Sequence, residues 1–352
     1  MKITSSFKYF KTALFLLTTV YLTTTVNISY SGSNTEKLRN TRDCSGCDLK
    51  QADLEGLYLR NALLEEADLR EAKLDRADLR NAILENADLR SASLSNANFK
   101  GANLNNANFE GTKLENVLID EQTIIDDKWF LVWQISNRLI ERQNLSFVNL
   151  EGANLSGMNL RNYNLEETNL KRANLNDTNL RDANLSKTKL QEANLIFANM
   201  KGSNLSFSEL QEANLNNAEL ANADLSNADI KEASLKNANL RMANLSNTNL
   251  RKANLSYVNF SGANLQNANL QGADLTEATL IDADLRGANL KDTNLNNAYL
   301  RTSSLGNIQL CGAILPSGDR YICKDDSSYR NQSRESLESL GYADGWMSTQ
   351  VE

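Results

Sequence analysis

Four cysteines and no histidine limit the chemistry that this chain can perform. Cys44 and Cys47 form a C-x-x-C pair, whereas Cys311 and Cys323 lie near the other end of the sequence. A C-x-x-C pair can be a redox couple, or it can supply half of a zinc site that needs two further ligands. The lack of histidine excludes Ser-His and Cys-His catalysis and histidine-based metal sites. Redox activity and a structural role both remain open for the pair.

Other catalytic signatures are also missing from the sequence. It contains neither a phosphate-binding loop nor a dinucleotide fingerprint. Its carboxylates are numerous, but they follow a repeat that places them on an outer surface rather than in a cleft that would shift their pKa. We therefore predict no catalytic residue, no metal site and no cofactor, and we interpret the chain as a non-enzyme.

The elements that carry these residues repeat every five residues. Within residues 49–114 every fifth residue is Leu or Phe, and within residues 145–315 every fifth residue is Leu except at Met200, Ile230 and Phe260. We call these residues the centres. Two positions before each centre stands a small residue, usually Ala. Such monotony is the signature of a repeat architecture.

Neither an α-helix nor a straight strand can bury this pattern. At about 100° per residue, centres five apart would move around a helix, and on a strand every second centre would face outward. A chain that turns a corner every five residues buries both the centre and the small residue on each side. Four sides make a 20-residue coil, and coils would stack through backbone hydrogen bonds about 4.8 Å apart.

The pattern A-(D/N)-L-x-x resembles that of the pentapeptide repeat family. It occurs here as ADLRE, ANLNN and ADLSN, and the resemblance covers about residues 47–315. Membership in that family implies an all-β fold, a right-handed quadrilateral β-helix. The handedness and the square cross-section come from this resemblance and not from the periodicity.

The ends and one interruption define the expected organisation. Residues 1–31 read as a signal peptide, with Lys2, Lys8 and Lys11 before an uncharged run, although an uncleaved membrane anchor remains an alternative. The remaining boundaries that we predict are an N-terminal cap at 32–46, repeat block one at 47–115, a helical insert at 116–144, repeat block two at 145–315, and a C-terminal cap with a disordered tail at 316–352.

The insert carries apolar side chains at helical spacing, with Asp126 or Asp127 as the N-cap. These side chains are Trp129, Val132, Trp133, Leu139 and Ile140. They can plug the rod or form an interaction patch for a partner, and we favour the plug.

We expect a 127–141 helix to fold back on block one. Leu63 and Ile83 are apolar residues 20 apart at the outward position before a centre, so their face is the preferred seat. The open end of the coil stack, with Leu114 and Ile119, is the alternative seat.

Two disulfides are predicted. Cys44 is in phase with the centres and Cys47 with the Ala positions, so both point inward. Opposite ends of a rod are too far apart for a bridge, which needs Cα atoms within about 7 Å. This distance favours Cys44–Cys47 and Cys311–Cys323, and an exported chain would permit oxidation.

Charged residues of block one form parallel ladders along the rod. Basic residues after the centres run beside aspartates before them, as in Asp68-Leu69-Arg70. The basic ladder alone would suit an anionic partner, but the neighbouring aspartates favour faces that neutralise themselves.

The signal, the Cys-x-x-Cys-Asp-Leu opening, the Asp-Asp-Lys-Trp insert and the repeat restart resemble those of exported cyanobacterial members of the family. That resemblance implies the periplasm or thylakoid lumen. We predict a non-catalytic scaffold or protein–protein interaction rod with an unknown protein partner. Contact with a membrane would occur only through an uncleaved N-terminal segment. The net charge of −7 argues against nucleic acid as a ligand.

The alternative function is DNA mimicry, because the best-understood family members bind DNA gyrase in that way. Mimicry would need a cytosolic protein with a long acidic stripe. The longest acidic ladder found in block two is Glu192, Glu212 and Glu232, beside basic residues.

Overall fold

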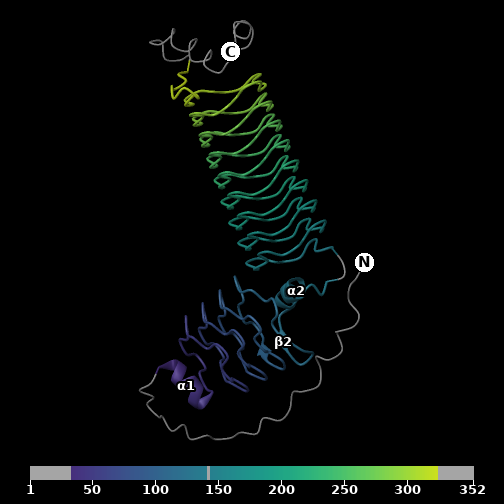
Figure 1. Ribbon diagram of the computed structural model, residues 1–352, viewed down its shortest axis with the longest axis vertical. Coiled ribbons are helices and arrows are strands. Elements are labelled where there is room, and N and C mark those ends of the chain that lie inside the picture. The colour runs from purple at the N-terminus through teal and green to yellow at the C-terminus, as the bar shows by residue number, and fades with distance from the viewer. Residues whose placement is uncertain (1–32, 141–142, 324–352) are drawn as a thin grey trace.

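The computed structural model describes residues 33–140 and 143–323 (Figure 1). A helix, α1 (Asn34–Thr41), precedes the coils of block one. Near the end of that block, strand β1 (Asn103–Leu104) pairs in parallel with β2 (Ile124–Ile125), and helix α2 (Asp127–Ser136) follows. The coils of block two come next. The predicted signal peptide and most of the predicted tail lie outside the described residues.

Both blocks are stacks of 20-residue coils, as the period predicted. Parallel bridges join residues 20 apart, from Asp43 with Leu63 in block one to Asn294 with Ile314 in block two. Each rung uses backbone bonds between coils, such as Leu49 N–H to the Asp68 carbonyl at 2.8 Å. The chain is therefore a β-helical solenoid in which most strands are single bridges.

Each corner is a tight turn with one left-handed residue. The Ala52 N–H donates to the Leu49 carbonyl across the first such turn at 3.0 Å, and Gln51 between them has φ of 57°. A positive φ at the third turn residue defines a type II turn, which favours Gly and Asn. The frequent Asn and Gly two residues after the centres are the sequence cue for this turn.

The core is a thin column of centres and small residues. Leu84 and Ala82 are fully buried, and most of their equivalents in both blocks are at most 9% exposed, whereas a few such as Ala52, Leu57 and Ile308 are partly buried. Where Thr replaces Ala, its hydroxyl finds a partner inside the column. Thr168 donates to the Leu145 carbonyl at 2.7 Å and Thr248 to the Leu225 carbonyl at 2.8 Å. Buried polar atoms that are hydrogen-bonded in this way carry little penalty.

Both outer ends of the stack are covered. Leu38 of α1 is fully buried against the first coil. At the other end the chain folds back after Leu315, so that Ile314 pairs antiparallel with Arg320 and the Tyr321 N–H donates to the Ala313 carbonyl at 2.7 Å. Covered ends are what a soluble repeat stack requires.

Candidate functional site

Helix α2 closes the end of block one. Its Trp129 packs edge-on against the Phe109 ring, with ring centroids 5.9 Å apart. Trp133 donates its indole Nε1–H to the Val117 carbonyl at 2.8 Å. The tryptophans therefore cover the last coil of block one, where a further coil would otherwise stack. The plug is the role that we favoured for this insert.

The residue after α2 replaces part of the missing coil. The Asn137 side chain donates to the Leu114 carbonyl at 2.9 Å and accepts from the Asn116 N–H at 2.8 Å. Arg138 then adopts a left-handed φ of 58°, and the helix ends at Ser136 rather than at the predicted residue 141. The helix is shorter because Asn137 is bonded to the coil below it.

The preferred seat on the Leu63/Ile83 face was wrong. Leu63 remains 37% exposed, and α2 lies at the junction instead. Phe109, Leu114 and their neighbours at an open coil end would expose more apolar surface than two stacked side chains. The exposed patch of Trp129, Val132 and Trp133 is not formed either, because Trp129 is 6% exposed and Val132 is fully buried.

Hydrogen bonds and ion pairs connect the two blocks beside α2. The Gly111 N–H donates to the Gly152 carbonyl at 2.9 Å, and the Asn154 side chain donates to the Gly111 carbonyl at 2.9 Å. Arg172 of block two lies 3.5 Å from a carboxylate oxygen of Glu110. The centres restart at Leu145, 31 residues after Leu114, so block two is one residue out of phase with block one. This shift is taken up where Gly111 changes its partner to block two.

Lys128 of α2 lies at the same contact, over the Trp129 ring. Its burial lowers its pKa below the usual value, and the nearby carboxylates of Glu151 and Glu110 oppose that effect. The lysine therefore adds a third charge to the Glu110–Arg172 pair.

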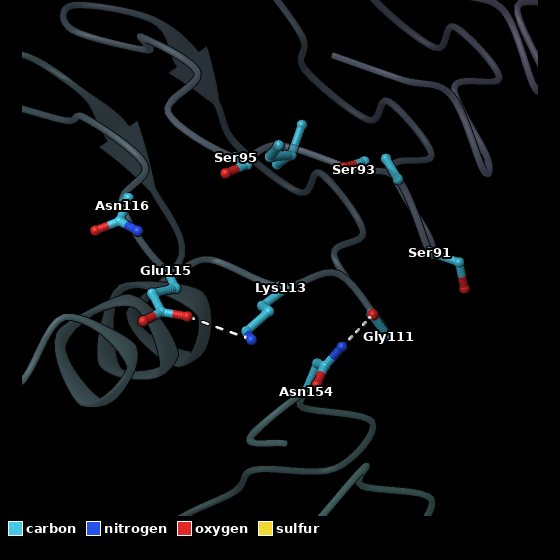
Figure 2. A pocket seen from close by; sticks show the side chains of 10 residues that line it. Ser91, Ser93, Ser95, Gly111, Lys113, Glu115, Asn116 and Asn154 are labelled. Atoms are coloured by element: carbon cyan, nitrogen blue, oxygen red, sulfur yellow. Dashed lines mark hydrogen bonds and ion pairs between the residues drawn. The ribbon is translucent and has the colours of Figure 1, made fainter. Parts of the chain in front are cut away.

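A polar cleft opens next to these contacts (Figure 2). Its volume is about 330 Å³. Ser91, Ser93 and Ser95 line one side, and Lys113, Glu115 and Asn116 line the other, with Asn154 of block two below. Lys113 and Glu115 form an ion pair at 3.3 Å. Hydroxyl, amide and charged groups dominate this lining, which is unlike the apolar lining of most small-molecule pockets.

The charge ladders of block one neutralise themselves, as the sequence indicated. Arg70 and Arg90 each make two-pronged contacts with Asp68 and Asp88 respectively, with shortest distances of 2.5 and 2.6 Å. The arginine hydrogen bonds hold the pKa of both aspartates below the usual value. In block two, Arg286 similarly lowers the pKa of Asp284 to about 2. Carboxylates fixed as anions in this way are poor general acids or bases at neutral pH.

The four cysteines occur as two pairs. Cys44 and Cys47 are bridged with Cα atoms 5.1 Å apart, and Cys311 and Cys323 with Cα atoms 5.2 Å apart. Cys44 is fully buried and Cys47 is 7% exposed, so both point inward. The second pair ties the fold-back of residues 316–323 to the last coil. These are the pairs that the rod geometry favours.

Within residues 33–140 and 143–323, no group of three potential ligands among His, Cys, Asp and Glu is placed to hold a metal ion. No helix in the same residues is long and apolar enough to cross a membrane.

Comparison with protein-family models decides the family. The model for pentapeptide repeats matches eight copies, which together span residues 43–118 and 144–315. The chain belongs to the pentapeptide repeat family. The two matched spans agree closely with the two blocks, and the gap between them contains α2. No curated protein sequence matches the chain.

Several solved structures of pentapeptide repeat proteins are similar to the chain. HetL from the cyanobacterium Nostoc, involved in heterocyst differentiation regulation, is 26% identical, with 77% of this chain and 94% of HetL covered and a TM-score of 0.23. A thylakoid-lumen protein from Arabidopsis thaliana is 28% identical, with 29% and 70% covered and a TM-score of 0.28. QnrB1, a plasmid-mediated fluoroquinolone resistance protein, is 18% identical, with 58% and 98% covered and a TM-score of 0.31.

Proposed function

We propose that the chain is an exported, non-catalytic scaffold that binds another protein along the side of a rigid rod. The proposal assumes the right-handed, four-sided coil that the family resemblance implies. Four turns per 20 residues support the four-sided shape of this coil. Covered ends leave the sides and the junction as the surfaces available to a partner.

Aromatic residues at the corners of block two carry the proposal. Phe147 and Phe207 share one corner and are 69% and 58% exposed, while Phe197 and Tyr257 share another and are 56% and 47% exposed. Members of each pair are 60 residues apart, which is three coils or about 14 Å along the rod. Two corners therefore present aromatic side chains at the same spacing.

These aromatics occupy positions that suit them poorly. All four have a positive φ between 57° and 64°, in the left-handed position where Asn and Gly are usual. A bulky side chain is unfavourable there, and an exposed ring adds little apolar burial to the fold. Tyr257 has local support, because its hydroxyl donates to Glu277 at 3.3 Å and Lys236 lies over its ring. Exposed aromatics are, however, common anchors in protein interfaces. Binding explains both the residue type and the exposure.

Export is the second part of the proposal. The basic and then apolar N-terminal segment supports it, as does the disulfide pairing, since bridges persist in oxidising compartments. Periplasm or thylakoid lumen is the destination that the resemblance implies. A fusion of residues 1–35 to a reporter active only after translocation should be active. A reporter retained in the cytosol would contradict export and revive DNA mimicry.

The charge arrangement argues against DNA mimicry. Lys171 lies 3.4 Å from Glu192, and Glu232 lies 3.5 and 3.4 Å from Lys231 and Lys252. The longest acidic ladder is thus neutralised at two of its three members. A continuous anionic stripe, which a DNA mimic needs, is absent from that corner of the described coils.

Site-specific photo-crosslinking in the native compartment tests the binding surface. A crosslinker at position 207 should capture another polypeptide, whereas one at Asn267, three coils along the same corner, should not. With the crosslinker at position 207, the F147N change should reduce the same adduct without losing thermal stability, because Asn favours the left-handed turn. Equal capture from positions 207 and 267, or capture from position 207 that F147N leaves unchanged, would contradict the proposed surface.

A further inference from the structure

The backbone ladder of block one is regular up to its last coil. On one side of the coil, the Leu74 N–H donates to the Ser93 carbonyl and the Arg76 N–H to the Ser95 carbonyl, each at 2.8 Å. The Ser93 N–H donates in the opposite direction to the Ala72 carbonyl at 2.9 Å. Three hydrogen bonds therefore close this rung.

The next rung on the same side is open. The equivalent donors are the N–H groups of Leu94, Asn96 and Lys113, and none has a hydrogen-bond partner within the described residues. Ser93 is bridged to Lys73 but not to Lys113. Leu94 is 1% exposed, and buried backbone groups without partners are rare in native proteins.

The opening is confined to this rung. On one flank the Ser91 N–H still donates to the Glu110 carbonyl at 3.0 Å, and on the other the Phe99 N–H donates to the Leu118 carbonyl at 2.8 Å. The cleft of Figure 2 lies between these closed flanks. Because Gly111 bonds to Gly152 of block two, the segment that follows it is drawn away from Ser93.

We propose that this open rung is a binding site for an extended peptide segment of a partner protein, which adds a strand between the two coils. The unpaired groups are the donors and acceptors of a parallel ladder, so the ligand that satisfies them is a peptide backbone. Ser91, Ser93 and Ser95 line one wall with hydroxyl groups, which suit polar side chains on the guest. Leu94 and Leu114 already fill the core behind the rung, so the guest contributes backbone and not an apolar anchor.

A partner protein fits the site better than a small molecule does. The lining is polar, and the unpaired N–H groups are divided between the two walls, with Leu94 and Asn96 on one coil and Lys113 on the next, as they are in a β-ladder. Water would fill the cleft in the free protein, and a strand would replace several waters at once. This inference names the partner's binding mode and rests on the proposed scaffold function.

Photo-crosslinking with a defined probe tests the inference. The probe is an acetylated, amidated Ser-Thr-X-Thr-Ser peptide with a diazirine residue at X, used at millimolar concentration with the full exported chain. Adducts should map to residues 91–96 and 111–116. A peptide N-methylated at alternate amides keeps the side chains but loses backbone donors, and it should give at least about tenfold fewer adducts, equivalent to about 1.4 kcal/mol.

Variants separate the site from general peptide attachment. The K113P variant removes one unpaired donor, and it should lower adduct yield with a much smaller loss of thermal stability than proline at the paired position Lys73. Equal labelling by the N-methylated peptide, or adducts spread along the rod, would overturn the inference. Labelling that appears only after residues 324–352 are deleted would also overturn it, by identifying the chain's own tail as the occupant. The proposed scaffold function would survive these results if capture from position 207 persists.

Discussion

Blocks one and two share one backbone but differ in what joins the sides of successive coils. In block one, arginines after the centres also reach aspartates of the next coil, as Arg60 does with Asp78 at 2.7 Å. In block two, asparagine stacks on asparagine. The Asn184 side chain donates to Asn164 at 3.0 Å and accepts from Asn204 at 3.2 Å.

The difference shows that the backbone ladder and the core define the coil, while the outer side chains are interchangeable. Asp and Asn both accept a hydrogen bond from the backbone two residues on, such as Arg90 N–H at 3.2 Å and Ser186 N–H at 3.2 Å. That shared bond explains why the repeat takes either residue. Only the charge, and so the response to pH and salt, should distinguish the blocks.

Loss of the α2 plug should produce the largest difference in stability between block one and block two. The W129A variant removes the ring that packs on Phe109, and a buried Trp→Ala change costs about 3–5 kcal/mol. Because repeats contact only their neighbours, block one should unfold before block two. Urea unfolding followed by circular dichroism should then show two transitions. The L139A control, at a residue that is 53% exposed, should keep the wild-type curve.

Loss of a ladder donor should have the next largest effect. Lys73 donates its N–H to the Ala52 carbonyl at 2.9 Å, whereas Lys113 has the same place in the repeat and no partner within the described residues. The K73P variant should lose about 1–3 kcal/mol, because it leaves a carbonyl unpaired. The K113P variant should lose much less, as thermal melts can show. Equal losses would mean that the rung is closed in solution.

Breaking the asparagine stack of block two should have a smaller effect. The N184A variant removes the acceptor of Ser186 N–H and two side-chain bonds, with a loss of about 1 kcal/mol. Chemical unfolding of the variant should show this loss equally at pH 7 and pH 3, since Asn does not titrate. The S226A variant is the matched control, with an expected change within about 0.5 kcal/mol. A strongly pH-dependent loss would mean that charged groups hold these faces.

The ion pairs of block one should have the smallest effect and one that depends on pH. The pKa of Asp88 is lowered in the folded chain, so its pair stabilises above the unfolded value of about 3.9, and this contribution is lost as pH falls through the folded pKa. At neutral pH the free energy of unfolding of the wild type should exceed that of D88N by at most about 1 kcal/mol, because the Asp88–Arg90 pair is partly exposed to solvent. Melting temperatures at pH 6 and pH 2, in low and high salt, can measure it. A gain that persists at pH 2 would exclude the ion pair as its source.

Much of the fold could be predicted from the five-residue period. It identified the inward residues, the 20-residue coil, the break between the blocks and the cysteine positions. The left-handed turn residue was missed, although Asn and Gly two residues after the centres carry that signal. The asparagine stacks were also missed, because their bonds join coils rather than neighbours in sequence.

The junction could be predicted only in part. Apolar spacing indicated a helix over residues 127–141. The place where this helix docks depends on how much apolar surface each alternative leaves exposed to water, and this area cannot be read from the sequence. Asn137 ended the helix through bonds to a coil 23 residues earlier in the chain. The sequence gives no signal for the open rung, because Ser93 and Lys113 both fit the repeat pattern. Local pattern predicts the coil, whereas the contacts of Gly111 and Asn137 decide where it is interrupted.

Residue-by-residue amide hydrogen exchange of the free protein tests the central claim most directly, namely that two closed coil stacks meet at one open rung beside α2. The amides of Leu74 and Leu190 are paired between coils and should exchange slowly. Those of Leu94, Asn96 and Lys113 should exchange faster by at least about a hundredfold, given about 3 kcal/mol of local protection elsewhere. Equally slow exchange at these three amides would contradict the account, because it would show one uninterrupted ladder through the end of block one.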